Sequence, residues 1–350
     1  MTQSNLTVRP GATERAFQRT GAVCATARSL RAAEKLILFY LAYVVFEAMV
    51  FPLSLAGRLT VAILNSATAL VLAILARFGR EKPLTTTPFG AFQGSPWAAP
   101  STDRGPTWTI LDDAPRTQLL ATIRNWFPAL IILLAYRESG LFSLFGNTHR
   151  LDDAFMRWDM LLLHHRWVLG ILHSGAPWLQ RYLELCYTLC YPLVPLGMGA
   201  LYILARQPGP VTRGRFEFER TIDQFWTAVL LALFICYALF PFFPSTPPRL
   251  LFQDTSGPAV HPLFRKLNFW ILEHYGIQSS VFPSGHVAAV TAVALSVYYR
   301  WPRAGVVFTI AAASIALVTV VERYHYAADA VIGALIGITA FLISKRVHRV

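Results

Sequence analysis

Eight apolar segments, most of them close to 20 residues long, are the feature that most restricts how this chain folds. They span residues 35–54, 57–77, 124–143, 182–205, 223–243, 283–299, 304–321 and 326–344. A helix needs about 20 mostly apolar residues to cross a bilayer. Because 55% of the 350 residues are hydrophobic and only 14% are charged, the chain is too apolar for an ordinary soluble domain. The sequence therefore predicts an all-α integral membrane protein, a bundle of about eight transmembrane helices.

The basic residues are distributed unequally between the two sides of this predicted bundle. With the amino terminus inside, the inner segments contain 21 of the 31 Lys and Arg residues, as the positive-inside rule expects. They do not gather with aromatic residues on one soluble module, so no nucleic-acid partner is expected. No apolar core precedes position 36, which argues against a cleavable signal peptide. We expect a bacterial inner (plasma) membrane protein, with a mitochondrial presequence at the amino terminus as the minor alternative.

A stretch rich in Pro, Gly, Ser and Thr divides the chain. Residues 80–118 are expected to form an irregular inner loop. This loop separates a cytosolic basic tail, residues 1–34, and a two-helix N-terminal unit, residues 35–79, from residues 119–350. The last part contains every residue assigned to chemistry below and is expected to hold a six-helix catalytic core. Within it, residues 147–181 alternate apolar and polar groups, which predicts an amphipathic helix at the outer interface.

Two groups of potential metal ligands have simpler explanations. Cys186 and Cys190 are one helical turn apart, but buried cysteine more often behaves as a small hydrophobe. The acidic and histidine residues of the amphipathic stretch match no compact ligand cluster, so they predict a wetted polar face. These residues are Asp152, Asp153, Asp159, His164, His165 and His173. We therefore expect no metal and no cofactor, and the four cysteines suggest no disulfide framework.

Three polar segments are expected to meet on the outer side: FFPSTPPRLL at 242–251, FPSGH at 282–286 and RYHYAAD at 323–329. Between His286 and His325 the chain passes through two apolar segments separated by the basic turn RWPR at 300–303. It therefore crosses inward and returns, and both histidines face the same side. The residues gathered in this way are Arg249, Ser284, Gly285, His286, Arg323, His325 and Asp329.

The two histidines and the aspartate suit phosphoryl transfer. That reaction needs a nucleophilic histidine, a carboxylate that orients its ring, and a second histidine that protonates the departing alkoxide. His325 and Asp329 are at i and i+4, and they share a helix face if position 325 opens the last helix. His286 supplies the second imidazole.

Phosphate oxygens also need fixed donors. Arg249 and Arg323 can each bind an oxygen through a planar guanidinium, although Glu322 or a lipid phosphate would equally explain Arg323. Ser284 can cap the helix that follows, so that the amides after Gly285 point at the anion. No carboxylate cluster suited to magnesium is visible on this side, which favours metal-free chemistry.

FPSGH and the HYAAD of 325–329 resemble the second and third signature motifs of the type 2 phosphatidic acid phosphatase superfamily. PSTPPR at 244–249 resembles the first motif as it occurs in the inositol phosphorylceramide synthase (inositolphosphotransferase) branch, and the similarity covers residues from about 147 to 344. The resemblance implies that His325 is the nucleophile and forms a phosphohistidine, with Asp329 as its orienting partner and His286 as general acid. It also implies that Arg249 and the Ser284–Gly285 turn hold the phosphate.

The chain departs from the simple lipid phosphatases of that superfamily. Those enzymes usually carry a lysine and an arginine where this chain has Phe242 and Thr319, and Arg323 is the candidate replacement for one of them. We expect a metal-independent membrane enzyme that cleaves a lipid phosphate or phospholipid and passes the group to water or a hydroxyl acceptor. The alternative is a noncatalytic protein that binds or transports lipid phosphates. The lipid, the acceptor and the oligomeric state stay open.

Overall fold

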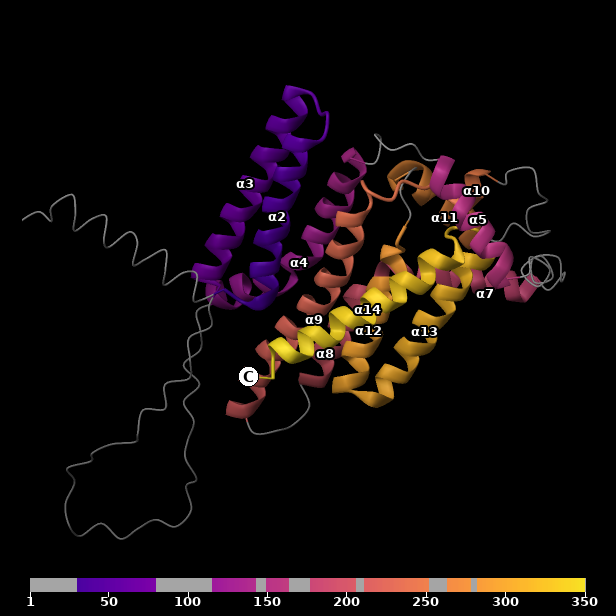
Figure 1. The fold of residues 1–350 in the computed structure, drawn as a ribbon. Coiled ribbons are helices and arrows are strands. Elements are labelled where there is room, and N and C mark those ends of the chain that lie inside the picture. Colours follow the sequence, from indigo (N-terminus) through magenta and orange to yellow (C-terminus); the bar gives the residue numbers. More distant parts are fainter. Residues whose placement is uncertain are drawn as a thin grey trace, which may run out of the picture. The chain divides into compact units, whose positions relative to one another are not determined.

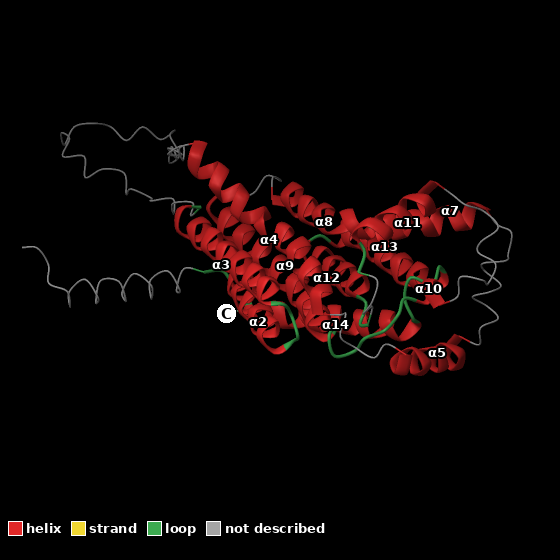
Figure 2. Ribbon diagram, turned by 90° about the horizontal axis from the view of Figure 1, so that it is seen from above, coloured by secondary structure: helices red, strands yellow, loops and turns green. Residues whose placement is uncertain are grey.

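The computed structural model describes residues 30–79, 115–142, 149–163, 177–205, 211–251, 263–277 and 282–349. Within these ranges every regular element is a helix and no strand occurs (Figure 2), so the prediction of an all-α fold is confirmed. Most of the basic tail, most of the inner loop, and His164, His165 and His173 lie outside the described residues.

The helices are α2 (Ala32–Val50), α3 (Leu55–Phe78), α4 (Pro115–Phe142), α5 (His149–Leu163), α7 (Pro177–Thr188), α8 (Cys190–Ala205), α9 (Val211–Leu239), α10 (Pro248–Leu251), α11 (Leu263–Tyr275), α12 (Gly285–Arg300), α13 (Pro302–Val321) and α14 (Ala327–Val347), as labelled in Figure 1. The chain forms two compact units. The larger comprises Leu30–Leu70 and Phe127–Val350, and the described part of the smaller lies within Val71–Trp126. All candidate site residues belong to the larger unit.

Five of the described helices are long and apolar enough to cross a membrane: Leu55–Phe78, Leu119–Phe142, Glu217–Leu239, Pro302–Val321 and Ala327–Val347. A sixth span results if Pro177–Thr188 and Cys190–Leu204, which are bent by 63° relative to each other, count as one. Two predicted spans, residues 35–54 and 283–299, are not among these helices. The α2 helix carries three charged residues, Glu34, Lys35 and Glu47, and α12 has only 16 residues, fewer than a bilayer requires. The predicted count of eight is therefore not confirmed, whereas an integral membrane protein is supported.

Small residues let α12 and α14 pack very closely within the larger unit. A Cβ atom added to Gly333 would lie 2.5 Å from the Ser284 carbonyl oxygen, and one added to Gly337 would lie 2.5 Å from that of Ala288. This is the small-xxx-small spacing by which membrane helices approach each other. Any side chain at Gly333 or Gly337 would separate the two helices, so these glycines determine how closely the start of α12 approaches α14.

A partly buried aspartate in the interior of α9 joins two helix ends in the same unit. Asp223 of α9 accepts hydrogen bonds from the backbone amides of Ala32 (3.0 Å) and Ala33 (2.9 Å), at the start of α2. The same carboxylate lies 3.0 Å from Nε2 of His348, directly after α14. A helix amino terminus favours negative charge, so Asp223 is well placed to hold α2, α9 and α14 together.

Candidate active site

His325 and Asp329 form the centre of the candidate site. His325 Nδ1 lies 3.3 Å from Asp329 Oδ2, and the same oxygen accepts the Tyr326 amide at 3.0 Å. The α14 helix begins at Ala327 with Tyr326 as its N-cap, so position 325 does not open the helix, contrary to the sequence expectation. His325 instead lies in the preceding turn, where its own amide donates to the Thr319 carbonyl at 2.8 Å. The i,i+4 contact is therefore made across a helix N-cap, with Asp329 fully buried.

His286 enters the site from the first turn of α12. Its ring centroid lies 5.8 Å from that of His325, at an interplanar angle of 62°. Ser284 caps the helix, since its hydroxyl accepts the Val287 amide at 3.4 Å; the predicted cap is confirmed. The Ser284 amide donates to the Asp329 carbonyl at 3.1 Å. Gly285, the first residue of α12, lies between the cap and His286, and a Cβ atom added to it would face Tyr237 and Leu233 of α9.

Arg249 and Arg323 are joined through their backbones. The Arg249 amide, in α10, donates to the Arg323 carbonyl at 2.9 Å. Among the described residues, no hydrogen bond or ion pair holds the Arg249 guanidinium, and Arg249 acts electrostatically on His286. Arg323 has a φ of 61°, a left-handed conformation unusual for a residue with a side chain. Burial lowers the pKa of Arg323, and Glu322 opposes this shift.

Two tyrosines that the sequence analysis did not single out flank His286. Its ring centroid is 5.8 Å from that of Tyr187 and 5.9 Å from that of Tyr191, with the Tyr191 ring perpendicular. Tyr187 in turn stacks on Tyr324, with centroids 3.8 Å apart. Tyr187 lies near the end of α7 and Tyr191 near the start of α8, two helices bent by 63° relative to each other. Their i,i+4 spacing in the sequence therefore did not reveal that both rings meet His286 of α12.

Aspartates of α5 contact two of the segments that form the site. Asp152 Oδ1 accepts the Thr246 amide at 2.7 Å, and Asp159 Oδ1 accepts the Ala327 amide at 2.8 Å. The predicted wetted polar face is wrong for Asp152, which is 3% exposed, whereas Asp153 is exposed. Burial raises the pKa of Asp159 to about 6; the Ala327 amide lowers it, and the Asp329 charge adds to the rise. The helical periodicity of the sequence does not show that these aspartates accept hydrogen bonds from backbone amides of distant segments.

Of the predicted amphipathic stretch, residues 147–181, the structure describes residues 149–163 and 177–181. The α5 helix ends at Leu163, and Pro177 begins α7, which packs against α11 and α13. The apolar side chains of Trp158, Met160 and Leu161 are exposed on α5, whereas the polar side chain of Asp152 is buried. In the described part of the chain, no group of three or more His, Cys, Asp or Glu residues is arranged to hold a metal ion.

Fold and site together define a helical membrane protein with a histidine–aspartate centre. Residues 153–343, more than half of the chain, match the PAP2 superfamily. The chain belongs to this superfamily. The resemblance to the superfamily is confirmed, while assignment to the inositol phosphorylceramide synthase branch stays a prediction. The match begins within α5 and ends within α14, so α2, α3 and α4 lie outside it.

One curated relative has a partial match. A PA-phosphatase related-family protein of Dictyostelium discoideum is 36% identical over 115 residues, which are 28% of this chain and 20% of that protein. The chain therefore spans about a fifth of the relative's length. No solved structure matches the chain significantly.

Proposed function

We propose that the protein is a membrane lipid phosphatase or phosphotransferase that works through a phosphohistidine. The observation that carries the proposal is the Asp329 carboxylate 3.3 Å from His325 Nδ1, together with the His286 ring 5.8 Å away. Binding of a lipid phosphate alone would need neither a carboxylate that orients a histidine nor a second imidazole. Transfer of the phosphoryl group needs both. This difference argues against the noncatalytic alternative.

In the first step, Asp329 accepts a hydrogen bond from the Nδ1–H group of His325, which orients the ring so that the lone pair on Nε2 attacks phosphorus. As the Nε2–P bond forms, the bond from phosphorus to the leaving oxygen breaks. Protonated His286 gives its proton to that alkoxide, and the negative charge of the phosphate favours the protonated imidazole beforehand. Arg249 and the amides at the start of α12 stabilise the phosphate oxygens, and Arg323 is the second candidate cation.

In the second step, His286, now neutral, takes a proton from the acceptor. The acceptor oxygen attacks the phosphohistidine, the Nε2–P bond breaks, and His325 returns to its starting form. Water as acceptor gives a phosphatase, and a hydroxyl compound gives a transferase. The PSTPPR segment and the replacement of two basic positions by Phe242 and Thr319 support the transferase-like branch. A phosphate site with fewer cations suits a donor that carries less charge than a phosphate monoester.

The decisive experiment measures turnover by the purified full-length protein. Dioctanoyl phosphatidic acid in detergent micelles is expected to release phosphate with the wild type and not with His325→Ala. A total lipid extract, analysed by mass spectrometry before and after incubation, would reveal transfer to a hydroxyl acceptor. If the wild type and His325→Ala bind the phosphatidic acid equally and neither converts any lipid, the noncatalytic alternative is correct.

We further propose that the site faces the extracytoplasmic side of a bacterial plasma membrane. The support is the excess of Lys and Arg in the inner segments, where 21 of 31 lie. In a variant without native cysteines, Lys266→Cys on α11 should react with an impermeant thiol reagent added outside intact cells. Arg303→Cys, in the first turn of α13, should react only after permeabilisation. The reverse labelling pattern would refute this orientation.

A further inference from the structure

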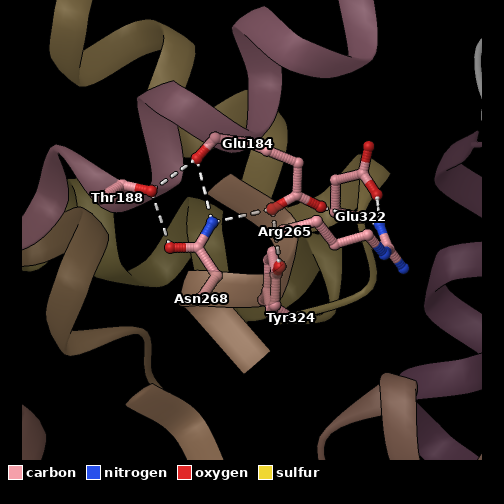
Figure 3. A network of polar contacts seen from close by, with 6 residues as sticks. All are labelled: Glu184, Thr188, Arg265, Asn268, Glu322 and Tyr324. Carbon is pink, nitrogen blue, oxygen red and sulfur yellow. Dashed lines mark hydrogen bonds and ion pairs between the residues drawn. The ribbon is translucent and has the colours of Figure 1, made fainter. Parts of the chain in front are cut away.

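A buried polar network connects α7, α11 and the turn between α13 and α14 (Figure 3). Its members are Glu184, Thr188, Arg265, Asn268, Glu322 and Tyr324. The Arg265 guanidinium donates to Glu184 Oε1 at 2.8 Å and forms a second ion pair with Glu322. Asn268 donates to the other Glu184 oxygen at 2.8 Å, and the Tyr324 hydroxyl donates to that oxygen at 2.9 Å. Glu184 is therefore the centre of the network.

The network places two carboxylates around one guanidinium in a buried environment. Glu184 and Asn268 are fully buried, and Glu322 is 3% exposed. Burial raises the pKa of Glu322 to about 7; the Glu184 charge adds to the shift and Arg265 opposes it. Buried ion pairs of this kind are often no more stabilising than well-packed apolar residues. Stability alone therefore explains the network poorly. Its position beside the candidate site suggests a role in the geometry of that site.

The part of the network nearest the site holds the turn that carries His325. Arg323 is left-handed, with a φ of 61°, and such a conformation persists only where the surrounding contacts over-determine it. The residues on both sides of Arg323 are held by the network: Glu322 by Arg265, and Tyr324 by Glu184. The Arg323 carbonyl itself accepts the Arg249 amide. The next residue after this anchored segment is His325.

The α7 helix also reaches the second histidine. Glu184 and Tyr187 are three positions apart on α7, and such residues share a helix face. Glu184 accepts the Tyr324 hydroxyl, while Tyr187 stacks on the Tyr324 ring at 3.8 Å. Tyr187 is also the ring 5.8 Å from His286. One helix therefore contacts both the turn before His325 and the ring of His286.

We propose that Glu184, Arg265 and Tyr324 are positioning residues that set the placement of His325 relative to His286. They act through the backbone of the 322–325 turn and do not touch the substrate. The inference rests on the proposed function, because the spacing of the two histidines matters only if both act on one phosphoryl group. It assigns a role to α11, which contains none of the residues recognised in the sequence.

The test uses Tyr324→Phe, with Tyr182→Phe as its matched control. Tyr182 lies on the same helix α7 as Glu184, and its hydroxyl is 2.7 Å from the Ser314 hydroxyl of α13. Each variant keeps its ring and loses its hydroxyl. The Tyr324 contact is buried and the Tyr182 contact is exposed, so Tyr324→Phe should lower the unfolding temperature more, and kcat is compared at a temperature where both variants are folded. With dioctanoyl phosphatidic acid, Tyr324→Phe should lower kcat about tenfold with little change in KM, as expected when only the transition state is affected. Tyr182→Phe should keep the wild-type kcat.

Two kinetic results would overturn the proposal: an unchanged kcat in Tyr324→Phe, or an equal fall of kcat in Tyr182→Phe. A second measurement does not depend on turnover. In protein labelled with ¹⁵N-histidine, the ring signals of His325, assigned with His325→Ala, should shift in Tyr324→Phe and not in Tyr182→Phe. If the wild type cleaves no phosphoester, the proposed function fails, but this shift would still support the positioning role. Unchanged signals would refute the positioning role even in an active enzyme.

Discussion

The α14 helix has a histidine–aspartate pair at each end, and the two pairs differ in what surrounds them. At its carboxyl end, His348 Nε2 lies 3.0 Å from Asp223, and Nδ1 lies 2.8 Å from the Ser344 carbonyl. Both ring nitrogens face oxygen acceptors, which requires the doubly protonated, cationic ring. Asp223 is also bonded to the amides of Ala32 and Ala33. This pair therefore joins the start of α2 and the end of α14 to α9.

At the amino end of α14, the pair has different neighbours. Asp329 Oδ2 faces His325 and accepts one amide, while Asp329 Oδ1 has no hydrogen-bond partner among the described residues. A second imidazole, His286, and the Arg249 guanidinium are close by. Identical residue types thus serve a structural role at one end and suit a chemical role at the other. The difference lies in the groups around the pair and not in the pair itself.

The largest expected effect separates the two histidines of α14. His325→Ala removes the atom that bonds to phosphorus, so turnover of dioctanoyl phosphatidic acid should fall by at least about 10⁴-fold. No ³²P-labelled phosphoenzyme should be trapped from a labelled substrate. His348→Ala, measured in the same assay, should retain turnover. If the His325 variant stayed active, the assignment of the two pairs would be wrong.

The next effect separates nucleophile from acid. His286→Ala leaves the nucleophile intact but removes the proton donor, so the rate with dioctanoyl phosphatidic acid should fall by about 10² to 10⁴-fold. The defect should shrink with an aryl phosphate, because its leaving group needs no proton, whereas the His325→Ala defect should persist. If the aryl phosphate rescued His325→Ala and not His286→Ala, the two roles would have to be exchanged.

A smaller effect concerns stability and its dependence on pH. His348→Gln should lower the free energy of unfolding by about 1–3 kcal/mol, the cost of losing a buried hydrogen bond to a charged group, with kcat unchanged. Burial would lower the pKa of His348, but its bonds to Asp223 and Ser344 outweigh this and raise the pKa above 6.5. A raised pKa means that the contribution is complete below this value and is lost as pH rises through the folded-state pKa.

The unfolding temperatures of the wild type and of His348→Gln, measured in detergent, should therefore differ most at or below about pH 6 and converge as the pH rises through the folded-state pKa of His348. A difference that grew with pH would contradict the protonated state of His348. If His348→Gln lowered kcat and left the free energy of unfolding unchanged, the structural role assigned to His348 would be wrong.

The smallest expected effect is that of metal removal. The chemistry assigned to His325, His286 and Arg249 provides the nucleophile, the acid and the charge stabilisation that a metal would otherwise supply. Treatment of the purified protein with EDTA should therefore change phosphate release by less than about twofold. If EDTA abolished activity and magnesium restored it, these three residues would not be sufficient for the reaction without a metal ion.

Several elements could be predicted from local sequence. Most of the apolar segments are helices in the structure, because a membrane helix depends on about 20 consecutive residues and satisfies its own backbone. Ser284 was recognisable as a helix cap for the same local reason. The span count was less predictable, since α2 includes three charged residues and α12 is short, and their fit to a bilayer depends on their neighbours.

By itself, the sequence determined the helical membrane class and the segments that contain His286, His325, Asp329 and Arg249, because hydropathy and motif spacing are properties of consecutive residues. Only the tertiary structure decided which side chains surround them. Gly333 and Gly337 set the approach of α12 to α14, and Glu184 with Arg265 reaches the 322–325 turn from other helices. The contacts that Arg265 and Glu184 make with this turn join positions 57 and 140 residues apart. They arise from packing, which no local pattern records.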